Sequence, residues 1–176
     1  MAGPIYGCLA QDHARLDALL RQAIAAPGEV DRSSYAAFRA GLLRHIGMEE
    51  KILLPAARRA RGGVPLPVAA RLRRDHAAFA ALLVPTPTAE IVGEILGLLE
   101  GHNALEEGVG GLYESCDELL AAEAEAITSS LRAAPEVRVA PYSDGPRVRA
   151  HIQTLLDAAR GGGPPLTQPL PRPRRS

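Results

Sequence analysis

The spacing of apolar residues is helical along almost the whole chain. Apolar side chains recur every three or four residues, which is the interval that places them on one face of an α-helix. The few runs that could form strands lack the alternation of apolar and polar residues that a half-buried sheet requires. The pattern therefore predicts an all-α protein.

The first two predicted helices form a pair. The first runs from about Pro4 to Ala26, where Pro27-Gly28 ends it. The second starts near Asp31 or Ser33, and both residue types are common N-caps. We expect Pro55 to kink or end this second helix, because proline lacks the N–H that a helix interior needs.

A second pair follows a loop at 61–65 that is rich in glycine and proline. The third helix has an apolar face formed by Val68, Leu72, His76, Phe79 and Leu83. The fourth opens near Thr88, and its apolar face extends to Val109. The predicted organisation is a bundle over 1–134, a linker and C-terminal helix over 135–160, and an extended tail rich in proline, glycine and arginine over 161–176.

Charge and composition narrow the function classes. The 20 basic residues balance the 20 acidic ones, which gives no electrostatic reason to expect a nucleic acid or an anionic membrane as partner. No apolar run approaches the roughly 20 residues needed to cross a bilayer. The N-terminus lacks the basic start and apolar core of a secretory signal, and the two cysteines form no disulfide framework. We expect a cytoplasmic protein.

A repeat carries the candidate chemistry. An Asp-His dipeptide occurs on the first and third predicted helices, and a His-x-x-x-Glu-Glu segment occurs on the second and fourth. The four segments are, in chain order, Asp12-His13, His45 to Glu50, Asp75-His76 and His102 to Glu107. The repetition indicates a helix pair that is duplicated to make an antiparallel four-helix bundle.

The repeat predicts a metal site. A spacing of four residues puts each histidine and its glutamate one turn apart on the face that must point into the bundle, where unpaired polar groups are costly. A metal ion is the simplest partner for all of them, and the candidate ligands are His13, His45, Glu49, His76, His102 and Glu106. The alternative is a polar core layer in which these side chains bond to one another. Imidazole and carboxylate ligands suit iron, manganese and zinc, and six of them fit two ions better than one.

Further polar residues flank these candidates. Glu50 and Glu107 lie about 140° around the helix from their histidines, so each either faces solvent, pairs with an arginine, or orients a ligand histidine. The two aspartates of the repeat have the same alternatives. Tyr6 and Tyr113 lie on the metal-facing stripe, either as core residues or as hydrogen-bond donors to a bound ligand. No separate substrate pocket can be recognised in the sequence, so no catalytic residue is predicted.

The order of histidines and His-x-x-x-Glu segments resembles the hemerythrin-like (HHE cation-binding) domain over about residues 4–120. The resemblance implies an up-down-up-down four-helix bundle, here with additional C-terminal helices, around two non-haem iron ions that share a bridging oxo or hydroxo group. The four histidines would be terminal ligands, and Glu49 and Glu106 would be bridging carboxylates.

One departure from the family bears on function. Oxygen-carrying members have a further histidine four residues after the third-helix histidine, where this sequence has Ala80. The resulting vacancies favour binding or sensing of dioxygen, nitric oxide or peroxide over oxygen transport. The alternatives are iron storage or donation, as in iron–sulfur cluster repair, and a di-iron redox enzyme. A binding or sensor protein is favoured over an enzyme.

Overall fold

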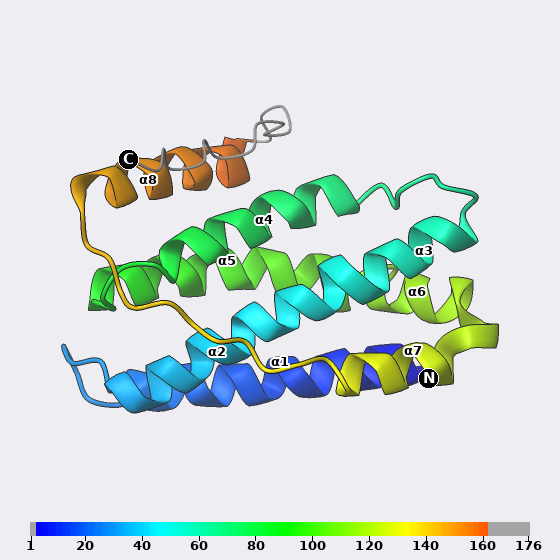
Figure 1. Cartoon of the computed structure of the whole chain (residues 1–176), viewed down its shortest axis with the longest axis horizontal. Coiled ribbons are helices and arrows are strands. Elements are labelled where there is room, and N and C mark those ends of the chain that lie inside the picture. The colour runs from blue at the N-terminus through cyan, green and yellow to red at the C-terminus, as the bar shows by residue number, and fades with distance from the viewer. Residues whose placement is uncertain (1–2, 162–176) are drawn as a thin grey trace, which may run out of the picture.

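The computed structural model of the chain describes residues 3–161, and every regular element in that range is a helix (Figure 1). Four of these helices form the bundle, namely α1 (Pro4–Ala23), α2 (Arg32–Met48), α4 (Ala69–Leu82) and α5 (Ala89–Glu107). Consecutive bundle helices run in opposite directions. The predicted all-α, antiparallel architecture is thereby confirmed.

The second helix continues past Pro55 instead of ending there. α2 passes into a π-helical turn, η1 (Glu49–Leu53), and then into α3 (Leu54–Ala60). A proline inside a regular α-helix has no N–H to donate and clashes with the carbonyl four residues earlier, and the wider π-turn relieves this clash. The turn begins at Glu49, so the irregular geometry lies at one of the candidate ligands.

The start of α1 is capped by a distant residue. Its N-cap, Gly3, has no side chain to offer, and the carboxylate of Asp117 in α6 (Leu112–Leu119) accepts hydrogen bonds from the N–H groups of Ile5 and Tyr6 at 2.9 and 3.0 Å. A Cβ atom on Gly3 would overlap this carboxylate. The close approach therefore requires glycine at this position, and it ties the start of the bundle to a segment that follows the bundle.

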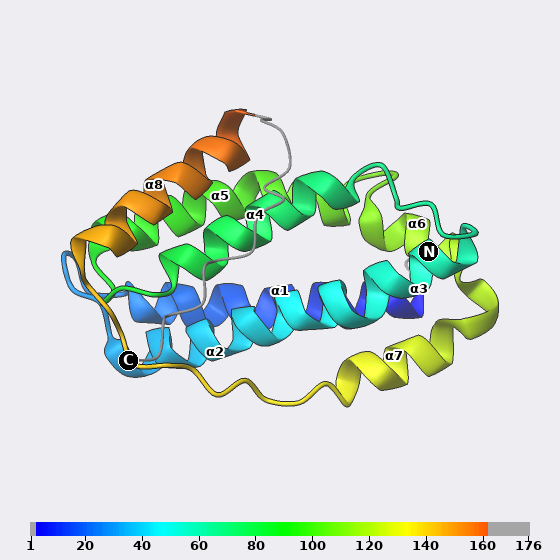
Figure 2. The same cartoon turned by 45° about the horizontal axis from the view of Figure 1, so that its top comes forward.

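The later helices cover the outside of the bundle. After α6 come the 3₁₀ turn η2 (Ala121–Glu123) and α7 (Ala124–Arg132), and both α6 and α7 pack on α1. The last described helix, α8 (Pro146–Gly161), lies along α4 (Figure 2). The chain between the bundle and α8 thus forms short helices rather than one long one.

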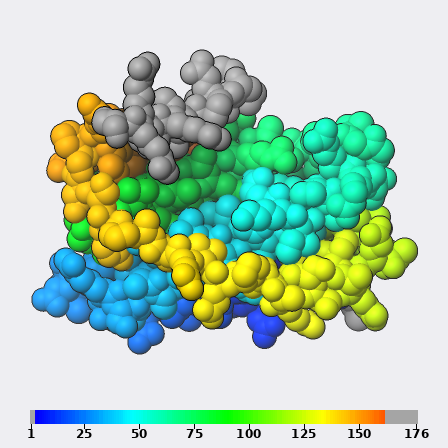
Figure 3. Space-filling view, viewed as in Figure 1, coloured from blue at the N-terminus to red at the C-terminus, as the bar shows by residue number. Residues whose placement is uncertain are grey.

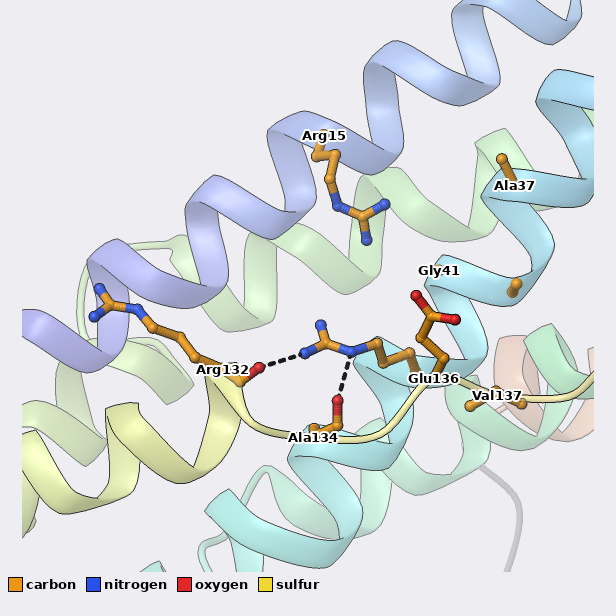
Figure 4. A pocket seen from close by; sticks show the side chains of 9 residues that line it. Arg15, Ala37, Gly41, Arg132, Ala134, Glu136 and Val137 are labelled. Atoms are coloured by element: carbon orange, nitrogen blue, oxygen red, sulfur yellow. Dashed lines mark hydrogen bonds between the residues drawn. The ribbon is translucent and has the colours of Figure 1, made fainter.

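The segment 133–145 joins α7 to α8 and crosses the surface of α2 (Figure 3). Arg44 of α2 holds its start, because the guanidinium donates hydrogen bonds to the carbonyls of Arg132 and Ala134 at 2.9 and 3.0 Å (Figure 4). Arg39, five residues earlier in α2, donates to the carbonyl of Ala140 at 2.9 Å. These bonds fix the segment to the bundle.

One sequence prediction is wrong in detail. Val109 was expected on the buried face of the fourth helix, but its side chain is fully exposed. The reason is that α5 ends at Glu107 and gives way to a turn in which Gly110 has a φ of +71°, a conformation that favours glycine. Residues 162–176 of the predicted tail lie outside the described residues.

The apolar core has two parts with a polar layer between them. The first cluster includes Ile5, Leu9, Met48, Leu53, Leu72 and Leu112. The second includes Leu16, Leu20, Phe38, Leu42, Phe79 and Ile95. Along every bundle helix a histidine lies between residues of the two clusters. Among the described residues, no helix is long and apolar enough to span a membrane.

Candidate metal centre

The six candidate ligands meet in the polar layer. They are His13 from α1, His45 from α2, Glu49 from the π-turn, His76 from α4, and His102 and Glu106 from α5. All six are buried, and even the most accessible, His13, exposes only 9% of its surface. The four-residue spacing aligns each histidine with its glutamate, and the antiparallel packing brings the two halves of the repeat together.

Each candidate carboxylate faces both halves of the bundle. Glu49 has Oε1 3.5 Å from Nε2 of His45 and Oε2 3.0 Å from Nε2 of His76. Glu106 repeats the arrangement, with Oε2 3.4 Å from the imidazole of α1 and Oε1 3.1 Å from the imidazole of α5. A carboxylate that presents one oxygen to each of two imidazole pairs has the geometry of a bridging ligand.

These contacts define two adjacent positions for a metal ion. Position one lies among Nε2 of His13, Nε2 of His45, Oε1 of Glu49 and Oε2 of Glu106. Position two lies among Nε2 of His76, Nε2 of His102, Oε2 of Glu49 and Oε1 of Glu106. One donor atom from each residue of position two lies within 4.8 Å of every other, and the same holds for His13, His45 and Glu106.

Position two contains buried polar atoms that need a partner. Oε2 of Glu49, Nε2 of His76 and Oε1 of Glu106 make no hydrogen bond within the described residues. Native proteins rarely leave such atoms unpaired, because each has lost its contact with water. A cation at position two would satisfy all three at once, so the residues fit a metal ion.

The hydroxyl of Tyr113, in α6, lies among the donors of position one. Its Oη is 2.7 Å from Oε1 of Glu49 and 3.2 Å from Oε2 of Glu106. It is also 3.1 Å from Nε2 of His13 and 3.2 Å from Nε2 of His45. Neighbouring ligands of a six-coordinate ion with bonds of about 2.1 Å are about 3 Å apart. Tyr113 therefore has the spacing of a fifth donor at position one.

The other ring nitrogen of each histidine faces a carboxylate. Within each half of the repeat, the aspartate approaches the histidine of the following helix. Asp12 Oδ2 is 3.0 Å from Nδ1 of His45, and Asp75 Oδ2 is 3.5 Å from Nδ1 of His102. Carboxylates in this place fix the ring orientation of a metal-binding histidine and present its Nε2 to the ion.

Glu50 and Glu107 make the same contact between the two halves. Glu50 Oε1 is 2.8 Å from Nδ1 of His76, and Glu107 pairs with Nδ1 of His13. Of the alternatives that the sequence left open, the structure places these two side chains against candidate ligands. Arginines that the sequence did not single out support three of the four carboxylates. The pairs are Arg15 with Asp12 at 2.8 Å, Arg71 with Asp75 at 3.0 Å and Arg73 with Glu50 at 3.1 Å.

The carboxylates also set the charge of the imidazoles. Burial alone would lower the pKa of His45, but the carboxylates of Glu49, Asp12 and Glu106 raise it to about 10. Burial acts likewise on His76, and Glu106 and Glu49 raise its pKa to about 11. His13 differs, because burial and the charge of His45 lower its pKa. In the absence of metal, His45 and His76 are thus protonated at neutral pH, and a metal ion must displace these protons.

The remaining residues of interest lie outside the donor set. Tyr6 donates from its hydroxyl to the carbonyl of Glu107 at 3.0 Å, and its ring packs edge-on against Tyr113 with 6.0 Å between the centroids. Ala80, at the position of the missing histidine, is exposed, and so is His151 in α8.

Comparison with known proteins agrees with this geometry. The family model of the hemerythrin HHE cation-binding domain matches residues 5–109, which contain all six candidate ligands and make up more than half of the chain. No curated protein and no solved structure matches the chain. Tyr113 lies just beyond the matched range. The extent of the match and the order of the ligands show that the chain belongs to the hemerythrin HHE cation-binding domain family.

Proposed function

We propose that the chain holds two metal ions, with iron preferred over other metals, and that the pair binds dioxygen, nitric oxide or peroxide. The observation that supports two ions is the division of the carboxylate oxygens. Glu49 and Glu106 each present one oxygen to each imidazole pair. A single ion at position one would leave Oε2 of Glu49, Nε2 of His76 and Oε1 of Glu106 without a hydrogen-bond partner in the buried layer.

The donor set and its burial support iron as a retained cofactor. Imidazole, carboxylate and phenol donors suit iron, although manganese and zinc accept most of them. Nearly complete burial of all six candidate ligands favours a resident metal pair over iron that is stored for donation. A redox-active pair would supply the electrons that bind or reduce a small oxidising molecule.

The chain's own residues prepare the site for such a ligand. Asp12, Glu50 and Glu107 bond to the Nδ1 atoms of their histidines, and Asp75 lies 3.5 Å from the fourth, so each Nε2 lone pair faces the centre. The two apolar clusters pack against the ends of the layer and limit its contact with water. Position one has five protein donors and position two has four, so a six-coordinate ion at position two has more room for a ligand from solution.

Metal analysis of freshly purified protein tests the proposal. We expect about two ions per chain, mainly iron, as two adjacent donor sets require. Glu106→Gln should lower the metal content to one ion or fewer, because it weakens both positions. The matched control, Glu90→Gln at an exposed site of the same helix, should retain both ions. Metal-free protein, or unchanged metal content in the Glu106 variant, would contradict the proposal.

The ligand is tested on the reduced, iron-loaded protein. Dioxygen, nitric oxide and hydrogen peroxide are added separately, and the absorption spectrum is followed. A spectral change that reverses when the gas is removed supports binding or sensing, whereas repeated consumption of peroxide would assign the site to an enzyme. A protein whose spectrum responds to none of the three would refute this part of the proposal.

A further inference from the structure

Charge is divided unevenly along the chain, although its formal total is zero. Residues 51–74 contain seven basic residues and no acidic one, whereas residues 75–131 contain eleven acidic residues and no basic one. The basic stretch covers most of η1, all of α3 and the start of α4, and the acidic stretch extends through α5 and α6 into α7. The two stretches meet at the end of the bundle where α3 contacts α6 (Figure 2).

A groove of about 750 Å³ lies at this end, between the α3–α4 loop, the end of α5 and α6. Arg61, at the end of α3, lines one side of it, and Glu118 of α6 lines another. Within residues 3–161 neither side chain forms an ion pair. The rest of the lining is largely apolar and includes Leu66, Val68, Leu105 and Leu119. The groove therefore has a positive side and a negative side with apolar surface between them.

Large apolar side chains are exposed at the same end of the bundle. Val109, which lines the groove, is fully exposed, and Val64 in the α3–α4 loop exposes 56% of its surface. In the described part of the chain, Leu96 of α5 is the other exposed side chain of this kind. Exposed apolar surface that is rimmed by polar groups is typical of a surface that binds another protein.

A second copy of the chain fits this surface. In a dimer with twofold symmetry both subunits use the same patch, so each contact between two residues occurs twice. A patch with opposite charges on its two sides meets this condition, because the rotation brings the positive side of one copy onto the negative side of the other. A formal net charge of zero also means that no long-range repulsion keeps two copies apart.

We propose that the groove between the α3–α4 loop and α6 is the contact surface of a twofold homodimer. In this dimer Arg61 of each copy pairs with Glu118 of the other, and Val109 is buried between the copies. A strongly acidic or basic partner fits less well, because it would meet a like charge on one side of the groove. The contact is small, so we expect a dissociation constant on the order of 1–100 µM. This inference goes beyond the proposed function and does not depend on metal.

The test is exchange of the paired charges in the full chain, with the dimer measured by sedimentation at several concentrations. Arg61→Glu and Glu118→Arg each replace two attractive pairs by two repulsive ones, so each variant should weaken the dimer by about tenfold or more. The double variant restores both pairs in reversed order and should regain the original affinity to within about threefold. The matched control is Glu100→Arg, an exposed carboxylate of α5 that does not line the groove, and it should leave the dimer unchanged.

A further variant tests the apolar part of the contact. Val109→Asp places a carboxylate where the two copies meet and should abolish the dimer, and because Val109 is fully exposed the helix content should stay the same by circular dichroism. An unmodified chain that is monomeric up to about 200 µM overturns the inference. It is also overturned if the dimer survives Val109→Asp, or if the double variant is as weak as the single ones. None of these results bears on metal content, which tests the proposed function separately.

Discussion

Replacing Tyr113 by phenylalanine removes a single oxygen from among the donors of position one and retains the ring that fills the core. Without metal, the main loss is the 2.7 Å hydrogen bond to Glu49, and a bond to a charged acceptor contributes about 1.5–3 kcal/mol. With metal, position one loses one of five protein donors. Mutating a residue that only hydrogen-bonds to a metal ligand typically lowers metal affinity about 10- to 100-fold. For the loss of a donor itself we expect metal affinity at position one to fall by about tenfold or more.

The assay for Tyr113→Phe is competition with a chelator. At chelator concentrations that leave two ions in the unmodified protein, the variant should retain about one, since position two keeps its four donors. In the iron form, the absorption band of a phenol oxygen bound to ferric iron should disappear. Tyr6→Phe is the matched control, because its hydroxyl bonds to a backbone carbonyl and its ring lies beside that of Tyr113. Equal affinity and equal spectra in both variants would show that Tyr113 only packs.

Three further predictions test the surroundings of the site. Asp12→Asn should weaken metal binding about 10- to 100-fold through His45 while leaving the helix content unchanged, as titration with a metal-buffered solution and circular dichroism would show. Metal-free protein should become less stable in urea as the pH rises from 6.5 toward 10. The reason is that the raised pKa values of His45 and His76 stabilise the fold fully below the ordinary value of 6.5 and no longer do so above the shifted values. Metal affinity should rise over the same range, and a flat profile of stability or of affinity contradicts the corresponding prediction. Gly3→Ala should lower the unfolding free energy by about 1 kcal/mol, as loss of a helix cap does, and should have no such effect if Asp117 is already alanine.

The sequence alone located the helices and the polar layer because both follow from local spacing. The apolar stripes defined the four bundle helices, and the four-residue interval between His45 and Glu49 put both side chains on one face. That these residues are metal ligands remains a prediction. The family and its fold were predicted from the same pattern, because the order of the ligands along the chain is itself the family's signature.

Contacts between helices could not be predicted in the same way. The angle between Glu50 and His45 around their helix could not predict the contact of Glu50 with His76, because His76 belongs to another helix. Tyr113 follows Glu106 by seven residues, which suggested the metal-facing side, but a glycine turn intervenes and only the packing of α6 determines where its hydroxyl lies. The exposure of Val109 has the same cause, since helical periodicity was extended across a turn that interrupts it.

The two halves of the repeat are equivalent except at one donor. The offset that relates Glu49 to Glu106 also relates Ala56 to Tyr113, so one half contributes a phenol where the other has a methyl group. Two iron ions in such unlike surroundings would differ in reduction potential, and electrons would enter the pair one at a time. If the chain holds two iron ions, as proposed, the broken symmetry would favour a mixed-valence state, which electron paramagnetic resonance would detect midway through a reductive titration.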